Sequence, residues 1–295
     1  MTQIINGRKI KNEMLQDIKE KVQKLDFVPI FCDILVGDDP SSLQYVQMKA
    51  KTAESVGIKF REAFFKAEST TEEVINAIEN LNKVPHMCGI IVQLPLPSHI
   101  DKERVLNSVD VELDVDCLNI KNSTNFYNGE ALHGFPTALA CMKVFDYAIE
   151  KLENLRQDVA SKKIVVLGQG VLVGRPVTHL LRERGLTVDV INSQTENKIS
   201  LIKEADVLIS AIGQGKYITG SMIKEGVVII DAGTSEENSS IVGDVDFDSV
   251  SNIASCISPV PGGVGPITVA TLIQNVLLVA ERKSKLKNKN GHINL

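Results

Sequence analysis

Residues 162–176, KKIVVLGQGVLVGRP, predict a strand, a tight turn and a helix in direct succession. The unbroken apolar run Ile164–Leu167 is typical of a strand that is buried on both faces. It leads straight into the spacing Gly-x-Gly-x-x-x-Gly and a second apolar run. A strand, a glycine-rich turn and a helix in this order form the pattern of a dinucleotide-binding loop.

Each of the three glycines has a mechanical role in this prediction. Gly168 permits the sharp turn, Gly170 lets backbone N–H groups approach a pyrophosphate, and Gly174 lets the helix pack closely on the strand. The helix N-terminus then faces the phosphates, and its dipole favours their negative charge. Glycines also gather in ordinary turns, so the triplet is weak evidence by itself.

Strand and helix patterns alternate through the second half of the chain. They fall at residues 163–168, 174–184, 187–191, 199–205, 207–212 and 227–231. This is half of a doubly wound nucleotide-binding fold. The second strand ends at Ile191-Asn192-Ser193, so the carboxylate that usually binds an NAD ribose is missing from its tip.

The first half alternates in the same way and predicts a second parallel sheet. Strands are expected at residues 28–36, 59–65 and 89–94, and helices at 41–55, 71–81, 101–106 and 136–150. We expect Ser41 or Ser42 to cap the first of these helices. Gln93 precedes Leu94-Pro95-Leu96-Pro97 and therefore lies at the carboxyl end of the sheet, where ligands bind in open α/β sheets.

Polar side chains gather around this predicted sheet end. Tyr45 and Lys49 are four residues apart on one helix and project from the same face. Asp114 and Asp116 belong to an acidic loop that follows Gln93 in the chain. Taken singly, an exposed tyrosine beside a solvated lysine, and aspartates that only form turns, explain these residues equally well.

The segment Ser258–Thr268, SPVPGGVGPIT, predicts a second ligand loop. Its prolines stiffen the backbone, and Gly262 and Gly263 allow a ligand to approach closely. A long apolar helix follows, and we expect it to pack back on the first domain, whereas the polar tail from Lys283 frays.

We therefore predict two α/β domains. Residues 1–145, joined by 268–295, form a substrate domain with a parallel sheet, and residues 146–267 form a Rossmann-like nucleotide-binding domain. Residues 154–161 are predicted to be the linker between them.

Composition excludes several classes of function. The 295 residues carry a formal net charge of -5 without a basic tract, which argues against nucleic-acid binding. The apolar runs are too short to span a bilayer, and Met1–Ile10 has no secretory apolar core, so a cytoplasmic location is expected. The five cysteines include no Cys-x-x-Cys pair, and no histidine stands at metal-ligand spacing, so no disulfide or metal is predicted.

The residues from Ile5 to Ala280 resemble the bifunctional methylenetetrahydrofolate dehydrogenase/methenyltetrahydrofolate cyclohydrolase family. Five segments carry the resemblance in order: Tyr45-x-x-x-Lys49, Val92-Gln93-Leu94-Pro95-Leu96-Pro97, Asp114-Val115-Asp116, Gly168-x-x-x-x-Val173-Gly174-Arg175-Pro176 and Pro259-Val-Pro-Gly-Gly-Val-Gly-Pro-Ile-Thr268.

The resemblance implies a role for each matching side chain. Lys49 serves acid–base chemistry at the one-carbon bridge of the folate, Gln93 hydrogen-bonds and tunes it, and Tyr45 stacks on the aminobenzoate ring. Asp116 holds the pterin. Further substrate contacts are implied for Pro261, Gly262, Gly263 and Thr268, and cofactor contacts for Gly168, Gln169, Gly170, Val173, Gly174, Arg175, Asn192 and Ser193.

The implied chemistry has two steps. A hydride passes from 5,10-methylenetetrahydrofolate to the nicotinamide, and water then opens the methenyl ring to give 10-formyltetrahydrofolate, a one-carbon unit for purine biosynthesis. Positioning two rings in a dry cleft suffices for the hydride transfer. The hydrolysis needs Lys49 in addition, as a base that must first lose its proton. The resemblance also implies a homodimer that pairs through the nucleotide domain.

The chain departs from the family pattern at two loops. Gln169-Gly170 replaces a usual Arg-Ser, and Asn192-Ser193-Gln194-Thr195 replaces a His-Ser-Arg-Thr stretch. The missing arginines would pair with the 2′-phosphate of NADP, so NADP is the family expectation and NAD is possible. Cys117 replaces a glycine after Asp116, and Gly134-Phe135-Pro136-Thr137 replaces Pro-Cys-Thr-Pro.

Two other functions stay open at this point. One is a nicotinamide-dependent dehydrogenase of a small hydroxy acid, with Lys49 and Asp116 as its acid–base pair. It needs an arginine near Gln93, and Arg61 and Arg104 are not obviously placed there. The other is a degenerate homologue that binds folate or nucleotide without turnover.

Overall fold

A computed structural model describes residues 2–237 and 240–291 of the chain, with side chains as far as residue 287. The chain divides into two compact units. The three-stranded unit consists of Asn12–Pro136 and Val269–Leu295, and the six-stranded unit consists of Met1–Lys11 and Thr137–Thr268.

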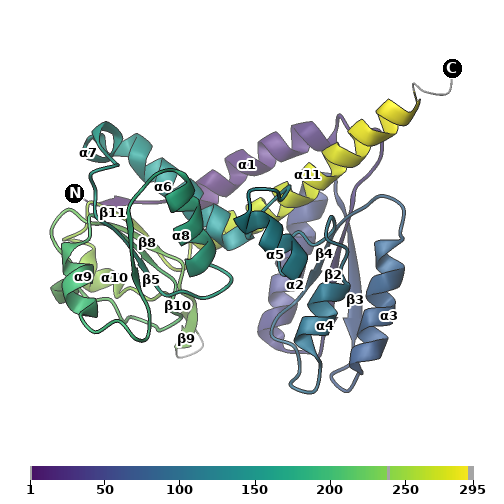
Figure 1. Cartoon of the computed structure of the whole chain (residues 1–295), viewed down its shortest axis with the longest axis horizontal. Coiled ribbons are helices and arrows are strands. Elements are labelled where there is room, and N and C mark those ends of the chain that lie inside the picture. Colours follow the sequence, from purple (N-terminus) through teal and green to yellow (C-terminus); the bar gives the residue numbers. More distant parts are fainter. Residues whose placement is uncertain (1, 238–239, 292–295) are drawn as a thin grey trace. The chain divides into compact units, whose positions relative to one another are not determined.

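The three-stranded unit is built on a parallel sheet in the order β3-β2-β4, and Figure 1 shows the strands side by side. Its strands are β2 (Ile30–Val36), β3 (Lys59–Phe65) and β4 (Met87–Val92). Its helices are α2 (Pro40–Ser55), α3 (Thr71–Asn82), α4 (Lys102–Ser108) and α5 (Ile120–Tyr127), and it shares α1 (Gly7–Val22) and α11 (Val264–Gly291) with the other unit.

Side-chain caps fix where the helices of this unit begin. Thr70 and Glu73 form a reciprocal capping box at α3. The prediction that Ser41 or Ser42 caps α2 is wrong. The carboxylate of Asp39 accepts a hydrogen bond from the Ser42 N–H at 2.8 Å, because Pro40 has no N–H and suits the first helical position.

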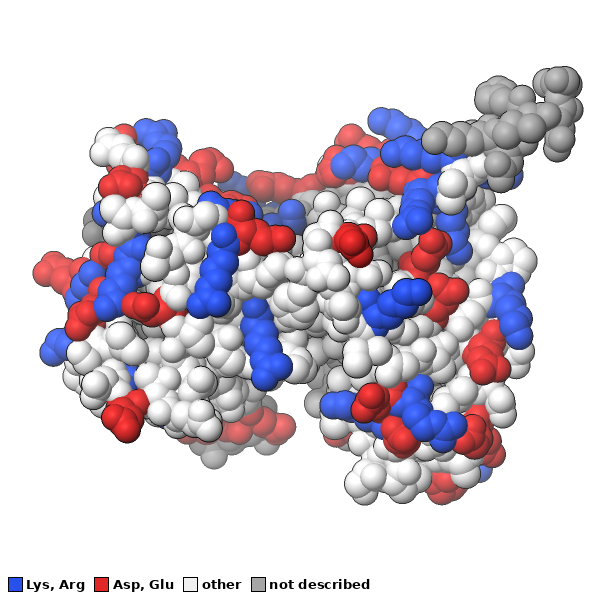
Figure 2. Space-filling model, viewed as in Figure 1, with Lys and Arg blue, Asp and Glu red and all other residues white. Residues whose placement is uncertain are grey.

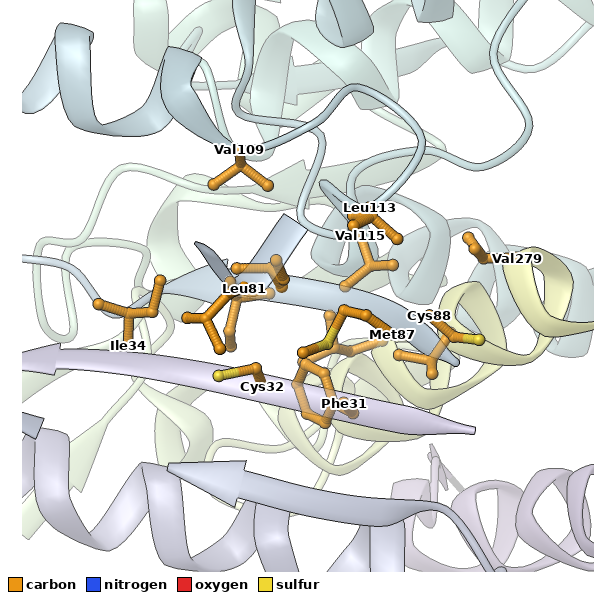
Figure 3. Packing of buried hydrophobic residues seen from close by; sticks show 14 of the residues in the cluster. Phe31, Cys32, Ile34, Leu81, Met87, Cys88, Val109, Leu113, Val115 and Val279 are labelled. Carbon is orange, nitrogen blue, oxygen red and sulfur yellow. The ribbon is translucent and has the colours of Figure 1, made fainter. Parts of the chain in front are cut away.

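The core of the three-stranded unit lies between its sheet, α3, α11 and the loop after α4. Figure 3 shows Cys32 and Phe31 of β2 near Met87 and Cys88 of β4, with Val279 of α11 close by. All five side chains are at most 1% exposed. Each buried side chain of this size stabilises the fold by about 1.5–3 kcal/mol relative to leaving it in water.

The six-stranded unit has a parallel sheet in the order β1-β11-β8-β7-β5-β6. Its strands are β1 (Gln3–Ile4), β5 (Ile164–Leu167), β6 (Val188–Ile191), β7 (Val207–Ser210), β8 (Val228–Asp231) and β11 (Cys256–Ser258). Its other elements are α6 (Pro136–Lys151), α7 (Glu153–Gln157), α8 (Gly174–Glu183), α9 (Lys198–Glu204), η1 (Gly220–Met222), α10 (Phe247–Val250) and the hairpin β9 (Ser235–Glu237) with β10 (Ser240–Val242). Figure 1 shows α9 and α10 on one side of this sheet and α6 and α8 on the other, so the sheet is doubly wound.

Several boundaries differ from those predicted. Residues 1–11 belong to the six-stranded unit, because β1 pairs with β11 and the Gly7 N–H donates to the Gly262 carbonyl at 2.9 Å. Residues 137–145 belong to the same unit, as part of α6. The linker predicted at 154–161 contains most of α7, which the buried Leu155 anchors.

The C-terminal helix also extends further than predicted. α11 continues to Gly291, so the prediction that the tail frays from Lys283 is wrong for that part. The Lys283 ammonium donates to the Met87 carbonyl at 2.6 Å, and Lys287 pairs with Asp26 at 2.6 Å, which holds this part of the helix on the three-stranded unit. The remainder of the predicted fraying, residues 292–295, lies outside the described residues.

One described helix is long and apolar enough to cross a membrane by length and composition alone. This segment of α11, Val264–Lys287, has a mean hydropathy of 1.5, yet 67% of its apolar window is buried inside the protein, as in the core helix of a globular fold. On the face drawn in Figure 2, basic and acidic side chains are interspersed, without a broad basic surface of the kind that binds nucleic acid.

Candidate functional site

A buried lysine lies at the centre of the predicted substrate site. Lys49 projects from α2, is 2% exposed, and places its ammonium 2.6 Å from a carboxylate oxygen of Asp33 on β2. Asp33 is itself fully buried. Charges are almost never buried unless they are paired, so this ion pair is what permits an amine in the interior.

Gln93 touches the same amine. It follows the last residue of β4, and its side-chain oxygen accepts a hydrogen bond from the Lys49 ammonium at 2.7 Å. The Gln93 amide nitrogen donates to the Leu94 carbonyl at 2.9 Å, which fixes the orientation of the side chain. The structure therefore brings Lys49 and Gln93 together at the carboxyl end of the sheet, where the sequence predicted a ligand site.

Tyr45 and Asp116 complete the cluster on the three-stranded unit. The Lys49 ammonium lies 5.5 Å from the centre of the Tyr45 ring, and Tyr45 is 40% exposed, so its face is available to a flat ligand. Burial raises the pKa of Asp116 to about 7; the charge of Lys49 opposes this rise, and the carboxylates of Asp114 and Asp33 add to it. The four side chains of Lys49, Gln93, Asp116 and Tyr45 thus bring together an amine, an amide, a carboxyl group and an aromatic ring face.

A network of buried amides holds the loop that carries Asp116. The Asp114 carboxylate accepts hydrogen bonds from the Asn119 N–H at 2.8 Å and the Asn122 amide at 3.1 Å. The Asn275 amide of α11 donates to the Val115 carbonyl at 2.9 Å. Sequence reasoning missed these amides, although the asparagine-rich run after Asp116 was a signal that could have indicated them.

Asp33 is the site residue that sequence reasoning missed altogether. Its signal is a charged residue inside the apolar strand IFCDILV. Side chains alternate along a strand, so Asp33 points to the opposite face from Cys32 and Ile34, and that face is covered by α2. Arg104, considered for a substrate carboxylate, instead pairs with Glu72 at 2.8 Å.

Cys117 adopts the left-handed backbone conformation, with φ of 63°, which explains why a glycine suits this position. The side chain is fully buried. Burial raises the pKa of the Cys117 thiol, and Asp114 and Asp116 add to the rise. The thiol therefore stays protonated at neutral pH and is a poor nucleophile.

The left-handed backbone conformation of Cys117 leads to a prediction about the stability of two variants at this position. We expect Cys117→Gly to stay within about 1 kcal/mol of wild type, because relief of backbone strain offsets the lost burial. Cys117→Val is similar in size but β-branched, and we expect it to cost about 3 kcal/mol. Urea unfolding of both variants measures this difference. Equal stability of the valine variant and wild type would show that the conformation is not strained.

The predicted cofactor residues come together at the carboxyl edge of the six-stranded sheet. Gly168, Gln169, Gly170 and Val173 form the loop between β5 and α8, and Gly174 and Arg175 begin α8. Asn192 and Ser193 follow β6, the neighbour of β5, and the Gly168 N–H donates to the Ile191 carbonyl at 2.8 Å. Both loops therefore lie at the same end of adjacent parallel strands.

The first loop fits a pyrophosphate. Gly168 has φ of 96°, and a Cβ on Gly174 would lie 2.0 Å from the Gly168 carbonyl oxygen, so both positions need glycine. A Cβ on Gly170 would meet nothing within 4 Å. The residue at the cap position of α8 is Val173, whose side chain has no acceptor, so no side chain caps the Gly174 N–H at the start of the helix. The next N–H, that of Arg175, donates to the Gly170 carbonyl at 3.1 Å, and Pro176 has none.

The open space around Gly170 predicts that a substitution there weakens cofactor binding without destabilising the fold. Because a Cβ at Gly170 would meet no other group of the protein, we expect Gly170→Ala to leave the midpoint of thermal unfolding unchanged and to raise the KM for the nicotinamide cofactor about tenfold, through a clash with the pyrophosphate. Gly265→Ala is the matched control, since a Cβ there also meets nothing within 4 Å. An unchanged cofactor KM in Gly170→Ala would contradict the phosphate contact.

The other predicted substrate residues belong to the six-stranded unit. Pro261, Gly262 and Gly263 form a loop after β11, and Thr268 lies in the first turns of α11. The Val260–Pro261 peptide is cis, and the Gly263 N–H donates to the Pro259 carbonyl at 2.7 Å. This hydrogen bond closes a turn within the loop.

Two families of known domains match the chain. The one described as tetrahydrofolate dehydrogenase/cyclohydrolase, catalytic domain, matches residues 5–116. The one described as tetrahydrofolate dehydrogenase/cyclohydrolase, NAD(P)-binding domain, matches residues 144–284. The first match contains Tyr45, Lys49, Gln93 and Asp116, and the second contains the glycine-rich loop.

Similar whole proteins give the same result. The bifunctional protein FolD of Methanosphaerula palustris is 38% identical over 281 residues, covering 95% of this chain and 98% of its own. The crystal structure of the bifunctional FolD methylenetetrahydrofolate dehydrogenase/cyclohydrolase from Campylobacter jejuni is 36% identical with a TM-score of 0.87, covering 96% of this chain and 100% of its own. The Trypanosoma brucei enzyme, solved with NADP and an inhibitor, is 32% identical with a TM-score of 0.86, covering 96% and 98%. The chain therefore belongs to the tetrahydrofolate dehydrogenase/cyclohydrolase family.

Proposed function

We propose that this protein oxidises 5,10-methylenetetrahydrofolate to the 5,10-methenyl form with a nicotinamide dinucleotide, and hydrolyses that product to 10-formyltetrahydrofolate. The observation that carries the proposal is the buried Lys49 amine, 2.7 Å from Gln93 at the carboxyl end of β4. Family membership over both units supports it. The dehydrogenase of a small hydroxy acid is not supported, since neither family match is of that kind.

The cluster assigns a task to each side chain. The exposed face of Tyr45 stacks on the aminobenzoate ring, and the Asp116 carboxylate accepts paired N–H bonds from the pterin. Gln93 holds the Lys49 nitrogen in place through its 2.7 Å hydrogen bond. A bound nicotinamide ring would accept the hydride. Lys49 then takes a proton from the water that attacks the methenyl carbon.

The cofactor loops support a weak preference between NADP and NAD. The four residues directly after β6, Asn192–Thr195, include neither an acidic residue, which would repel a 2′-phosphate, nor an arginine, which would attract one, and Glu196 follows them. Lys198 supplies a positive charge there, since its ammonium donates to the Ser193 carbonyl at 3.1 Å. We propose that both cofactors are used, with NADP favoured by less than about tenfold.

The test measures the oxidation step and the hydrolysis step separately. Purified protein is given methylenetetrahydrofolate with NADP or NAD, and reduced cofactor and loss of methenyltetrahydrofolate are recorded. Both activities should appear, and Lys198→Ala should lower kcat/KM for NADP about fivefold without changing that for NAD, the usual loss for one exposed ion pair. Absence of both activities from folded protein would favour the degenerate homologue that only binds.

The cellular location and the oligomeric state of the enzyme are also proposals. A net charge of -5 and the cytoplasmic expectation support a cytoplasmic enzyme that supplies one-carbon units for purine biosynthesis. We propose a homodimer that pairs through the six-stranded unit. Light scattering on the eluting protein measures the mass, and a single chain of 32.2 kDa at micromolar concentration would contradict the dimer.

A further inference from the structure

Asp33 differs from the other buried aspartates of the described chain. Asp114, Asp231 and Asp244 each accept two or three hydrogen bonds from N–H or O–H donors, so their carboxylates have evident structural roles. Apart from the Lys49 ammonium, neither oxygen of Asp33 has a hydrogen-bond donor among the described residues. Its one close polar contact is the Lys49 ammonium at 2.6 Å.

The geometry of this contact suits proton transfer. Nitrogen and oxygen are 2.6 Å apart, and the two side chains are 3% and 0% exposed, so the contact between them is shielded from bulk solvent. Gln93 fixes the Lys49 nitrogen from another direction at 2.7 Å. A buried carboxylate without hydrogen-bond donors has a high proton affinity, and burial accordingly raises the pKa of Asp33, which the charge of Lys49 opposes.

The other charges near the pair are acidic. Glu62 on β3 acts on Asp33, and Asp116 in the loop after α4 interacts with both Asp33 and Lys49. Two carboxyl groups, those of Asp33 and Asp116, therefore act on the Lys49 amine, and Glu62 acts on Asp33. Such a set holds an extra proton more readily than a lone lysine can, because each carboxylate favours a positive charge beside it.

We propose that Asp33 is the proton acceptor behind Lys49 in the hydrolytic step, so that the buried pair acts as one base. Lys49 passes one ammonium proton to the Asp33 carboxylate while its nitrogen takes a proton from the attacking water. The water O–H bond breaks as the oxygen–carbon bond to the methenyl carbon forms. Lys49 ends as an ammonium and Asp33 as a carboxylic acid, which then releases the proton to solvent through Lys49.

This inference rests on the proposed function and deepens it. A lysine that stays protonated cannot take a proton from water, and the pair removes that obstacle without moving a net charge out of the interior. Asp33 acts only through Lys49, so it is a positioning residue. The same pair could instead serve merely as a counter-ion for the lysine, and the two roles predict opposite effects of removing the carboxylate.

The test compares kcat for hydrolysis of methenyltetrahydrofolate in wild type, Asp33→Asn and Asp33→Glu across about pH 6 to 8.5. We expect Asp33→Asn to lower kcat about 100-fold with KM little changed, and to change the dependence of kcat on pH, because the carboxyl that shares the proton with Lys49 is gone. Asp33→Glu should recover at least about tenfold of that loss, since it restores a carboxylate. If wild type itself shows no hydrolysis, the proposed function fails and this inference with it.

A counter-ion role gives the opposite result. Without a negative partner Lys49 loses its proton more easily, so Asp33→Asn would keep or raise kcat, and that outcome would overturn the proposal. An Asp33→Glu variant that folds and is as slow as Asp33→Asn would overturn it too. Asp244→Asn is the matched control for a lost buried carboxylate, because Asp244 and its donors belong to the six-stranded unit. We expect this variant to unfold at a lower temperature with the wild-type pH profile of kcat.

A measurement on wild type covers the case in which the Asp33 variants do not fold. The relay moves two protons in one step, so kcat in mixtures of H2O and D2O should curve downward against the fraction of D2O. A straight line, as one proton in motion gives, would overturn the relay while leaving the hydrolase activity itself established.

Discussion

Lys49→Met should abolish hydrolysis of methenyltetrahydrofolate, with a loss of about 1,000-fold or more in kcat, and should slow the oxidation step by a smaller factor. Acid–base catalysis by a positioned side chain contributes about 10²–10⁴-fold, and the amine of Lys49 is the basic group at the centre of the cluster. Hydride transfer depends mainly on how the two rings are positioned, so it survives in part. Stopped assays of each step with purified variant measure both effects.

A control is needed because the substitution also breaks a buried ion pair. Removing one partner of such a pair costs about 3–5 kcal/mol, although protonation of Asp33, whose pKa burial already raises, reduces the cost. Lys51→Met on the exposed face of α2 controls for the change of residue type. Lys49→Met with Asp33→Asn removes both charges, and should regain stability without regaining hydrolysis. Ring opening at the wild-type rate in folded Lys49→Met would reject the assigned role.

Asp116→Ala should weaken folate binding about 100-fold. An ionised carboxylate that accepts two N–H bonds from a pterin contributes about 1.5–3 kcal/mol for each bond, and alanine accepts neither. Asp116→Asn keeps one acceptor oxygen, so its loss should be smaller. Titration calorimetry with a tetrahydrofolate derivative gives the dissociation constants, and an unaltered constant for Asp116→Ala would contradict the pterin contact.

The pKa of Asp116 adds a pH dependence to this prediction. Because its value in the folded protein is about 7, the carboxylate that binds the pterin is formed only as the pH rises through 7. The wild-type dissociation constant should therefore fall between pH 6 and pH 8, by up to about tenfold per unit on the acid side. Asp116→Asn has no such group, and its folate binding should change much less over this range.

The Asp116 carboxyl also affects the stability of the fold, which should fall, rather than rise, as the pH increases and the carboxyl ionises. The pKa of Asp116 is raised from 3.8 to about 7 on folding, so its favourable contribution is complete below about pH 3.8 and is lost as the pH rises through 7. The Asp116→Asn variant has no carboxyl at this position, so it does not lose stability in this way as the pH rises. The free energy of unfolding of the variant minus that of wild type should therefore rise between pH 4 and pH 7. Urea unfolding at several pH values measures it. Asp231, also raised to about 7, is common to both proteins and cancels in the comparison.

Local patterns predicted most of the elements that hold the site. The β3 strand and the start of α3 lie at the predicted residues, 59–65 and 71, since both depend on neighbouring residues only. The edge strand β1 and its neighbour β11 were not predicted. They have two and three residues, and such short runs become strands only through pairing with the rest of the sheet.

The sequence by itself determined the doubly wound class, the glycine-rich nucleotide loop and the motifs that define the family, because strand periodicity, glycine spacing and residue identity are all local. Only the tertiary structure decided that the carboxylate of Asp33 on β2 meets the amine of Lys49 on α2, and that Asn275 of α11 holds the loop beside Asp116. Those contacts join residues far apart in the chain, and the charge state of a buried amine or carboxyl depends on the groups that folding places around it.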